Sequence, residues 1–461
     1  MTDSLSLDRL LWFMVVIALT LIGLVWGLRD TRRVIEAPFL YAAGMAILMD
    51  PQYYIAVVNP GKVPDEAFWV YSVMVLLCSV AFYYGYLSKP LKTRTNPRVR
   101  ILWAIRDNRL FRMGGAIAVL GAFGSVQLSG MGEISEWRGW PVYWYTLSKV
   151  IEPGISLMLI SYFQSRKIER LVAALVFSIF PLLAVVTAGR RSVTIMLPLM
   201  YLLPFLLYHP KWRLPRLAVL VAGAFVFIVV YALPYWRGEF ASGRHLEAMS
   251  EQPLSVILED VFSGEKNLET LDSMIMTGSH FRMEYYEWGC MFYNSIIESY
   301  VPGSLIGHDL KDALRIGYGM SVDWMGAAYG INVAYYTGKS AYAELFGQFS
   351  FLGALFFFGV ARLFRRIRDA IAQYGDGRAL IFLCFFITIP PSLPWSQVLY
   401  GLSLQVPTLL VMALAFRWCL VRQVLPTSGF KGARAVQPAI GPGWRRAGAT
   451  GIKETHARTV E

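Results

Sequence analysis

Long runs of apolar residues, each close to the length that crosses a lipid bilayer, recur along almost the whole chain. Crossing the hydrocarbon core takes a helix of about 20 mostly apolar residues. Because lipid offers no water to exposed backbone groups, only helices and closed barrels can cross it, and these runs lack the residue alternation of barrel strands. The sequence therefore predicts an all-α polytopic membrane protein with about eleven transmembrane helices. They fall near residues 10–28, 35–56, 67–87, 111–129, 144–164, 169–188, 192–209, 214–235, 341–362, 377–392 and 399–420.

The composition supports the same class of protein. Hydrophobic residues make up 56% of the 461 residues and charged residues only 16%, whereas an average soluble protein has roughly 25% charged residues. Too few polar groups remain to cover the surface of a soluble domain, and the chain is too apolar for a disordered protein. A secreted disulfide scaffold is excluded as well, because three of the four cysteines lie in apolar runs and only Cys290 lies in a polar loop.

The basic residues indicate how the chain is oriented in the membrane. Thirty of the 43 Lys and Arg residues lie in loops or ends that fall on one side if there are eleven spans. Because cytoplasmic loops are enriched in Lys and Arg, this side is predicted to be cytoplasmic, with the N-terminus outside and the C-terminus inside. The net charge of +12 then reflects topology and attraction to anionic membrane lipids, and nucleic acid is not expected as a partner.

One long connection divides the chain. We expect an N-terminal transmembrane bundle over residues 1–235, a large extracytoplasmic loop over 236–339, a C-terminal transmembrane bundle over 340–420 and a basic disordered tail over 421–461. In the loop, seven basic residues meet fourteen acidic ones. Two of its stretches are amphipathic and are predicted to lie on the outer leaflet as interfacial helices. They cover residues 253–262 and 291–297.

Ionisable residues within the predicted spans gather in their outer halves. Asp50 lies towards the outer end of the second span, Lys149 and Glu152 begin the fifth, Arg237 closes the eighth and Glu344 opens the ninth. Each costs several kcal/mol at membrane depth unless it is paired or solvated, so such residues indicate function. Lys149 and Glu152 are three residues apart and could pair on one helix face. The asymmetry predicts a polar cavity that opens outwards.

The turn Gly189-Arg190-Arg191-Ser192 interrupts a long apolar stretch on the predicted outer side. Two arginines there oppose the usual charge bias. They could extend to the outer headgroups, or they could hold an anion, because the arginine fork matches phosphate oxygens. We favour the anion. Further candidates to bind it are Arg237, Arg244, Arg282 and Arg315 in the loop.

Three of the five histidines, His245, His280 and His308, lie in the same loop. Imidazole titrates near neutrality, so each could act as a general base, although a surface or packing role is the alternative for each. The sequence has no metal-ligand spacing of the H-E-x-x-H kind, no phosphate-binding Walker loop and no G-x-S-x-G nucleophile elbow. We therefore predict no metal and no cofactor.

The position of the candidate anion site restricts the substrate. Nucleotide sugars and ATP are not available outside the cytoplasmic membrane, so an activated substrate must arrive attached to a lipid. A lipid-linked pyrophosphate sugar matches the features: its tail suits the spans, its phosphates suit the arginines, and its glycan suits an aromatic-rich loop. Interfacial anchoring is the alternative role for these aromatic residues.

The arrangement of spans, the late outer loop and the Gly-Arg-Arg turn resemble the bacterial O-antigen polymerase family, also called oligosaccharide repeat-unit polymerases. The segment 337–353, TGKSAYAELFGQFSFLG, is similar to that family's motif after the loop, in which a Ser and an acidic residue precede an aromatic-Gly pair and a second Gly. The segment Pro302-Gly303-Ser304 also resembles the family's loop ahead of that span. The resemblance covers roughly residues 10–420.

This resemblance implies a C-type glycosyltransferase-like architecture and metal-independent transfer with inversion at the anomeric carbon. Donor and acceptor would be polyprenyl-pyrophosphate-linked oligosaccharides, and a chain-length regulator and a flippase would be partners in the inner membrane. It implies pyrophosphate binding by Arg190 and Arg191, with Arg237, Arg244 and Arg282 as weaker candidates. Catalytic candidates are Glu344, His245 and His280, whose order as the base stays open.

Other functions remain open at this point. An O-antigen ligase would use the same donor and transfer the glycan to another acceptor. A flippase or other transporter is a different class, but transporters usually show internal repeats and polar groups at mid-depth, which this sequence lacks. A non-catalytic subunit of a polysaccharide assembly machine is a further alternative.

Overall fold

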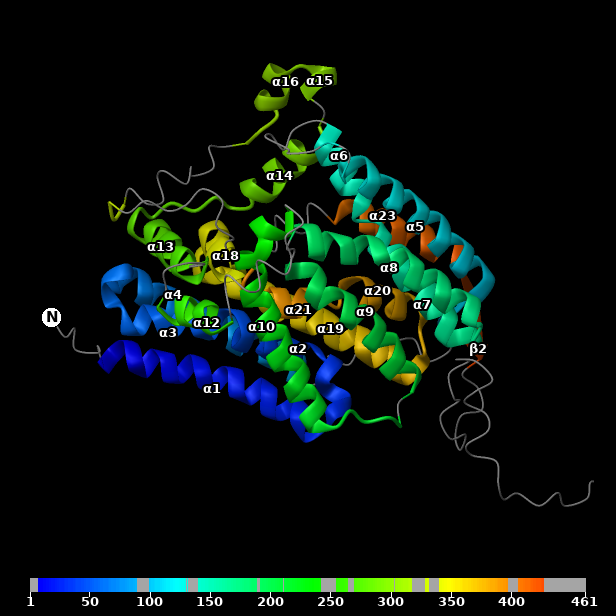
Figure 1. Cartoon of the computed structure of the whole chain (residues 1–461), viewed down its shortest axis with the longest axis horizontal. Coiled ribbons are helices and arrows are strands. Elements are labelled where there is room, and N and C mark those ends of the chain that lie inside the picture. Colours follow the sequence, from blue (N-terminus) through cyan, green and yellow to red (C-terminus); the bar gives the residue numbers. More distant parts are fainter. Residues whose placement is uncertain are drawn as a thin grey trace, which may run out of the picture.

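The computed structural model describes residues 7–88, 99–129, 131, 140–188, 191–209, 211–241, 254–263, 269–301, 303–316, 328–330, 340–396 and 405–426. These residues are mostly helical, and each of the predicted apolar runs contains a helix (Figure 1). Four helical stretches are long and apolar enough to cross a membrane, at residues 7–29, 65–87, 107–129 and 341–372. The fold is thus compatible with an all-α membrane protein, and the eleven crossings remain a prediction.

The first group of helices packs into one layer with α19 (Ala354–Tyr374). Helix α1 contacts α2 and α4, and α4 lies along α19. A buried tyrosine ties this layer together, because Tyr41 Oη lies 2.8 Å from Ser79 Oγ and 2.5 Å from Tyr342 Oη. The elements are α1 (Leu7–Arg29), η1 (Thr31–Ile35), α2 (Ala37–Gly44), the π-helical turn η2 (Met45–Met49), α3 (Asp50–Val58), η3 (Pro60–Lys62) and α4 (Asp65–Leu87).

The second predicted span is interrupted at its centre. Pro51 has no backbone N–H to donate to the preceding turn, and the chain adopts the π-helical turn η2 just before it. Other prolines are accommodated inside continuous helices, with Pro181 in α8 and Pro198 and Pro204 in α9. Among these four prolines, Pro51 is the one that is accompanied by a changed hydrogen-bond pattern in its helix.

A second group packs around α5 and α7. Arg170 of α8 is buried and forms an ion pair with Asp107 at the start of α5. The same guanidinium donates to Ser161 Oγ of α7 at 2.5 Å, so one side chain joins three helices. The helices are α5 (Asp107–Ser129), α6 (Trp140–Ser148), α7 (Ile151–Ser165), α8 (Ile168–Ala188), α9 (Arg191–Tyr208) and α10 (Arg216–Ala241).

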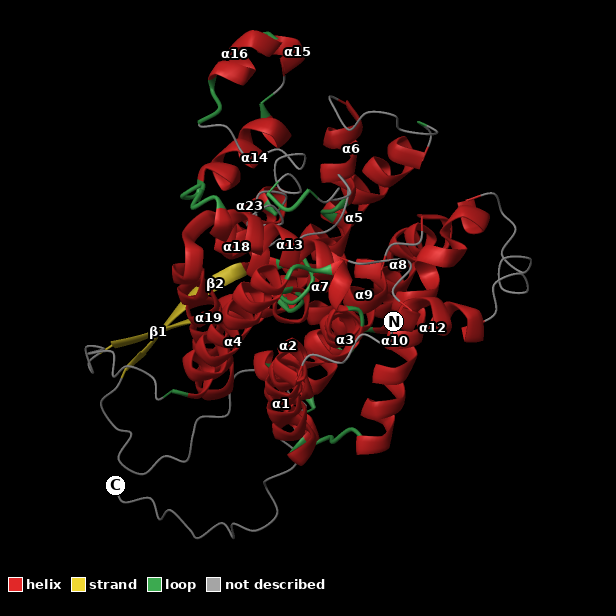
Figure 2. Cartoon of the chain, turned by 90° about the vertical axis from the view of Figure 1, so that its left-hand side faces the viewer, coloured by secondary structure: helices red, strands yellow, loops and turns green. Residues whose placement is uncertain are grey.

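The predicted loop contains several helices. Helices α12 (Leu254–Ser263) and α14 (Cys290–Tyr300) match the two amphipathic stretches, whose place on a membrane surface stays a prediction. Helix α13 (Glu269–Arg282) is different, because it packs into the bundle against α3, α4 and α18. Helices α15 (Gly303–Ile306) and α16 (His308–Ala313) lie furthest from the bundle, at the top of both views (Figures 1 and 2).

The last group begins with a broken span. Helix α18 (Ala341–Phe349) ends at Ser350, whose φ of 52° is left-handed, and the short η4 (Ser350–Gly353) leads into α19 (Ala354–Tyr374). The sequence predicts one continuous span here. The remaining helices are α20 (Gly377–Phe386), α21 (Ile389–Ser392) and α23 (Val406–Cys419).

Two strands depart from the all-α expectation. Strand β1 (Val99–Ile105) pairs antiparallel with β2 (Leu420–Pro426), with Val99 opposite Pro426 and Ile105 opposite Leu420 (Figure 2). The segment that the sequence assigns to the disordered tail therefore begins in a strand. The pairing joins segments far apart in the sequence, where two stretches rich in β-branched and other apolar residues meet.

Candidate functional site

Five of the predicted site residues have no described side chain. Arg190, Arg244 and His245 lie outside the residues that the structure describes. Arg191 begins α9 and Arg237 lies in α10, but only their place on the helix is described. Their assignment to pyrophosphate binding stays a prediction. The other three predicted residues, His280, Arg282 and Glu344, lie on α13 and α18.

Helices α13 and α18 run parallel, and residues on their facing sides lie at matching levels along the two helix axes. At one level the Ser340 N–H donates to Ser273 Oγ at 3.0 Å. Two turns further along both helices, a Cβ added to Gly347 would stand 2.6 Å from His280 Nε2. Equal steps along the two helices thus keep them in contact, which fixes their direction and register.

Glu344 belongs to the same interface as His280. It lies one turn before Gly347, so the two positions share a face of α18, separated by about 4.5 Å along the axis. Glu344 and His280 are each only 3% exposed. The fold therefore places Glu344 on α18 about one helical turn from the residue that contacts His280, and both side chains are buried, although they come from different predicted segments of the chain.

The imidazole of His280 is held in one orientation. Its Nδ1 lies 2.8 Å from the carbonyl oxygen of Tyr285. A carbonyl oxygen can only accept, so Nδ1 carries a proton, and in the neutral form of the ring the lone pair is therefore on Nε2. The Nε2 atom faces α18 at Gly347. Nε2 is the atom that would take a proton in acid–base chemistry.

The structure explains why glycine is needed at two positions of the segment 337–353, each for a different reason. At Gly347 the absent side chain makes room for the His280 ring. At Gly353 a Cβ would stand 2.6 Å from the carbonyl oxygen of Leu345, across the break between α18 and α19. Any larger residue would force these segments apart. Both glycines are therefore required by close packing around α18, Gly347 against His280 and Gly353 against Leu345.

The loop that follows α13 is fastened across the end of α18. The N–H groups of Glu287 and Trp288 donate to the carbonyl oxygens of Gly347 and Gln348, each at 2.9 Å. The Gln348 side chain donates to Glu287 and accepts from the Gly289 N–H at 2.9 Å. This double connection holds the loop in a fixed position next to the His280–Glu344 pair.

The fastened loop carries exposed aromatic rings. Trp288 is 64% exposed, and three other aromatic residues between Phe281 and Tyr293 are at least 38% exposed. Flat apolar rings with polar edges are suited to stacking on the faces of sugars. The sequence predicted this role for the loop aromatics, and four of them are exposed between the end of α13 and the start of α14: Phe281, Tyr285, Trp288 and Tyr293.

Arg282 lies away from the pair. It ends α13 two residues after His280, a spacing that puts side chains on different faces of a helix. Its guanidinium sits over the ring of Tyr329 at 5.2 Å, and Tyr329 Oη donates to Glu66 Oε2 at 3.0 Å. Burial and the Glu66 carboxylate raise the pKa of Tyr329, so this phenol stays protonated and keeps donating. Arg282 is exposed and positively charged at the edge of the site.

Sequence reasoning missed the part of the site that α13 supplies. This helix is short and carries a polar series, Ser273, Thr277, Ser279 and His280, so hydropathy assigns it to a loop. All four residues are nevertheless buried. The signal that could have found them is the helical spacing of small polar residues, which pack closely and hydrogen-bond between membrane helices. The cavity of about 600 Å³ that the described residues enclose lies elsewhere, beside η1, and the predicted outward cavity stays a prediction.

Comparisons with models of known families, with curated proteins and with solved structures find no match to this chain. The class of protein is therefore defined by the fold and the site alone. The part of the chain that the structure describes is largely helical, and four of its helical stretches are suited by length and composition to crossing a membrane. Its distinguishing feature is a buried interface between α13 and α18 that contains His280 and Glu344, next to a loop with exposed aromatic rings.

Proposed function

We propose that this protein is a glycosyltransferase that polymerises polyprenyl-pyrophosphate-linked oligosaccharide repeat units on the extracytoplasmic face of the bacterial inner membrane. The product would be a surface polysaccharide such as O-antigen, capsule or exopolysaccharide. The observation that carries the proposal is the packing of His280 against Gly347, one turn from Glu344. This segment is also the one whose sequence resembles the polymerase motif.

In the proposed reaction a hydroxyl oxygen of the acceptor glycan attacks the anomeric carbon of the donor. The new glycosidic C–O bond forms as the bond to the pyrophosphate oxygen breaks, and the configuration inverts. The hydroxyl proton passes to Glu344 or to Nε2 of His280. The pyrophosphate leaves on its lipid with the bonding electron pair.

The leaving group determines where positive charge is needed. Negative charge grows on the bridging oxygen as the bond breaks, and guanidinium groups aimed at that position stabilise the transition state. Arg190 and Arg191 are the proposed principal pair. Arg237, Arg244 and Arg282 are the proposed supporting groups, and Arg282 shares α13 with His280.

The support for one catalytic centre, rather than two separate residues, comes from proximity. A buried carboxyl next to an imidazole can orient the ring and stabilise its protonated form, as in other acid–base pairs. Both side chains are buried in the described structure, and the proposed route of the substrate is from the side of the aromatic loop. Trp288 and Tyr285 would then contact the incoming glycan.

Purified full-length protein and purified lipid-linked repeat units test the proposal. Formation of a ladder of longer glycans on the lipid carrier is the expected result. The double variant Arg190→Ala/Arg191→Ala should abolish the ladder. The matched control Lys167→Ala/Lys211→Ala removes two exposed cations from other loops and should leave the ladder unchanged.

The choice of acceptor separates the polymerase from the ligase. Lipid A core offered with the same donor should remain unmodified if the protein is a polymerase. Transfer to lipid A core without a ladder would identify a ligase instead. Absence of transfer to any acceptor by folded protein, with intact donor, would exclude the enzyme and leave the transporter or the assembly subunit.

A further inference from the structure

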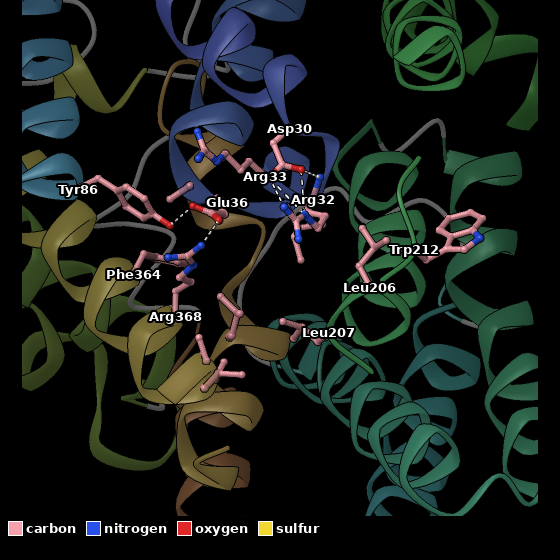
Figure 3. A pocket seen from close by; sticks show the side chains of 15 residues that line it. Asp30, Arg32, Arg33, Glu36, Tyr86, Leu206, Leu207, Trp212, Phe364 and Arg368 are labelled. Atoms are coloured by element: carbon pink, nitrogen blue, oxygen red, sulfur yellow. Dashed lines mark hydrogen bonds and ion pairs between the residues drawn. The ribbon is translucent and has the colours of Figure 1, made fainter. Parts of the chain in front are cut away.

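A second region, distant from the His280–Glu344 pair, encloses a cavity of about 600 Å³. It lies between η1, the ends of α9 and α19, and Leu383 in the second half of α20 (Figure 3). Volumes of this size accommodate small-molecule ligands. The cavity is at the end of the bundle where α1, α9 and α19 finish, which the distribution of Lys and Arg predicts to be cytoplasmic.

One wall of the cavity is polar. Arg32 is joined to Asp30, with 2.7 Å between Nη2 and Oδ2. Arg368 Nη2 lies 2.6 Å from Glu36 Oε1, and Tyr86 Oη donates to Glu36 Oε2 at 2.8 Å. Figure 3 shows the two ion pairs side by side on this wall. The ion pairs are partly open, since the Arg32 side chain is 49% exposed and that of Arg368 39%.

Positive charge is in excess at this wall. Three arginines line the cavity against two carboxylates. The third, Arg33, sits over the ring of Trp26 at 4.9 Å and forms no ion pair with any residue that the structure describes. Arg213 is also close enough to lower the pKa of Asp30, behind the larger effect of the Arg32 hydrogen bond. Arg32 binds Asp30 through Nε and Nη2, so its Nη1 group is available to a further acceptor.

The opposite wall is apolar. Leu206 and Leu207 of α9 face the ion pairs across the cavity, and Phe364 lies below Glu36 (Figure 3). Trp212 is 46% exposed at the margin. Tryptophan is enriched where membrane meets water, because one ring satisfies both environments. The cavity thus joins a cationic side to an apolar side within one space.

We propose that this cavity binds an anionic amphiphile through its phosphate group, with the phosphate against Arg32 and the hydrocarbon chain along Leu206 and Leu207. Guanidinium groups bind phosphate oxygens in charge-assisted hydrogen bonds, and basic pockets between membrane helices on the cytoplasmic side hold anionic headgroups. The apolar wall would be a poor surface for a fully hydrated ion, and the arginines would be a poor surface for a neutral lipid. The proposal does not depend on the glycosyltransferase activity.

Two membrane components share this chemistry. One is an anionic phospholipid, and the other is a polyprenyl phosphate carrier. Binding of the purified full-length protein in detergent is therefore measured with phosphatidylglycerol and with polyprenyl monophosphate in separate titrations. Diacylglycerol, which has no phosphate, and inorganic phosphate, which has no chain, are the controls. The tighter of the two amphiphiles identifies the source.

Variants locate the binding. Arg32→Gln keeps the length of the side chain nearly unchanged and removes its charge, so the Kd for the bound amphiphile should rise at least ten-fold. Leu207→Trp should weaken binding by filling the apolar side, while leaving all the arginines in place. Lys167→Gln removes an exposed cation outside the cavity and should change the Kd by less than two-fold.

Thermal unfolding shows whether each variant is folded before its affinity is compared with that of the wild type. Each variant is first shown to unfold cooperatively, and the bound amphiphile should raise the Tm of wild type and of Lys167→Gln but not of Leu207→Trp. Equal affinity of wild type for diacylglycerol and for both phosphate lipids would overturn the proposal. So would unchanged affinity in both folded Arg32→Gln and folded Leu207→Trp.

Discussion

The imidazole of His280 fills the space that Gly347 leaves open, so that a Cβ on Gly347 would stand 2.6 Å from Nε2. This contact sets the distance between α13 and α18 at the level of the candidate site. Because Glu344 lies one turn away on the same face of α18, the contact also determines how the carboxyl and the imidazole are placed relative to each other.

Gly347→Ala should therefore displace His280 and lower the stability of the protein. The overpacking is expected to reduce the free energy of unfolding by about 1–3 kcal/mol. Thermal unfolding of purified protein measures the change. Gly359→Ala is the matched control, because nothing lies within 4 Å of an added Cβ there. Combining Gly347→Ala with His280→Ala should cost less than the sum of the two single changes, and strict additivity would argue against the contact.

Glu344→Gln tests the carboxyl itself. If Glu344 takes the acceptor proton, or stabilises His280 as it does so, polymer formation should fall roughly 10²–10⁴-fold in the assay with lipid-linked repeat units. Glu298→Gln, at an exposed position of α14 in the same loop, should retain activity. Wild-type turnover and chain length in Glu344→Gln would remove this residue from the reaction.

The buried Arg9 predicts an asymmetric response to mutation. Its guanidinium donates to the carbonyl oxygens of Ala56 and Val63 at 2.7 Å and pairs with Asp65 at 2.6 Å. Arg9→Met should cost about 2–4 kcal/mol of unfolding free energy, because two buried carbonyls lose their donor. Asp65→Asn should cost less than about 1 kcal/mol, since that side chain is 92% exposed. Equal losses of unfolding free energy in Arg9→Met and Asp65→Asn would contradict this prediction.

The Asp30–Arg32 pair predicts how stability depends on pH. The Arg32 hydrogen bond lowers the pKa of Asp30 from 3.8 to about 2. A carboxyl whose pKa is lower in the folded state stabilises the fold above its unfolded pKa, and this contribution is lost as the pH falls towards about 2. The Tm difference between wild type and Asp30→Asn should thus be constant from pH 7 to pH 5. A difference that shrinks steadily across that interval would show that the pair is not formed.

The predicted orientation is tested with reporters. A periplasm-dependent reporter inserted near Gly264 should be active, and the same reporter after Lys167 should be inactive. A cytoplasm-dependent reporter should give the reverse pattern at both positions. Cytoplasmic activity near Gly264 would place the loop on the wrong side for a lipid-linked donor and would remove the basis of the proposed reaction.

The sequence alone predicted a largely helical chain and the positions of most of its helices. Apolar runs are local, and a run near 20 residues must be helical in lipid, so the segments later found as α1, α4 and α5 could be read directly. The placement of Glu344 in the first turn of a helix was also evident. The Lys149–Glu152 pair, read from its spacing, is confirmed with 3.6 Å between its charged atoms.

Only the tertiary structure decided which distant segments meet. Helix α13 is too polar and too short to be recognised by hydropathy, yet its polar face is buried against α18. The same holds for Arg170 with Asp107, and for the ion pairs beside η1, because these partners lie on separate elements. Hydropathy is a property of each segment alone, whereas the register of α13 on α18 depends on the shapes of both helices together, including the gap at Gly347.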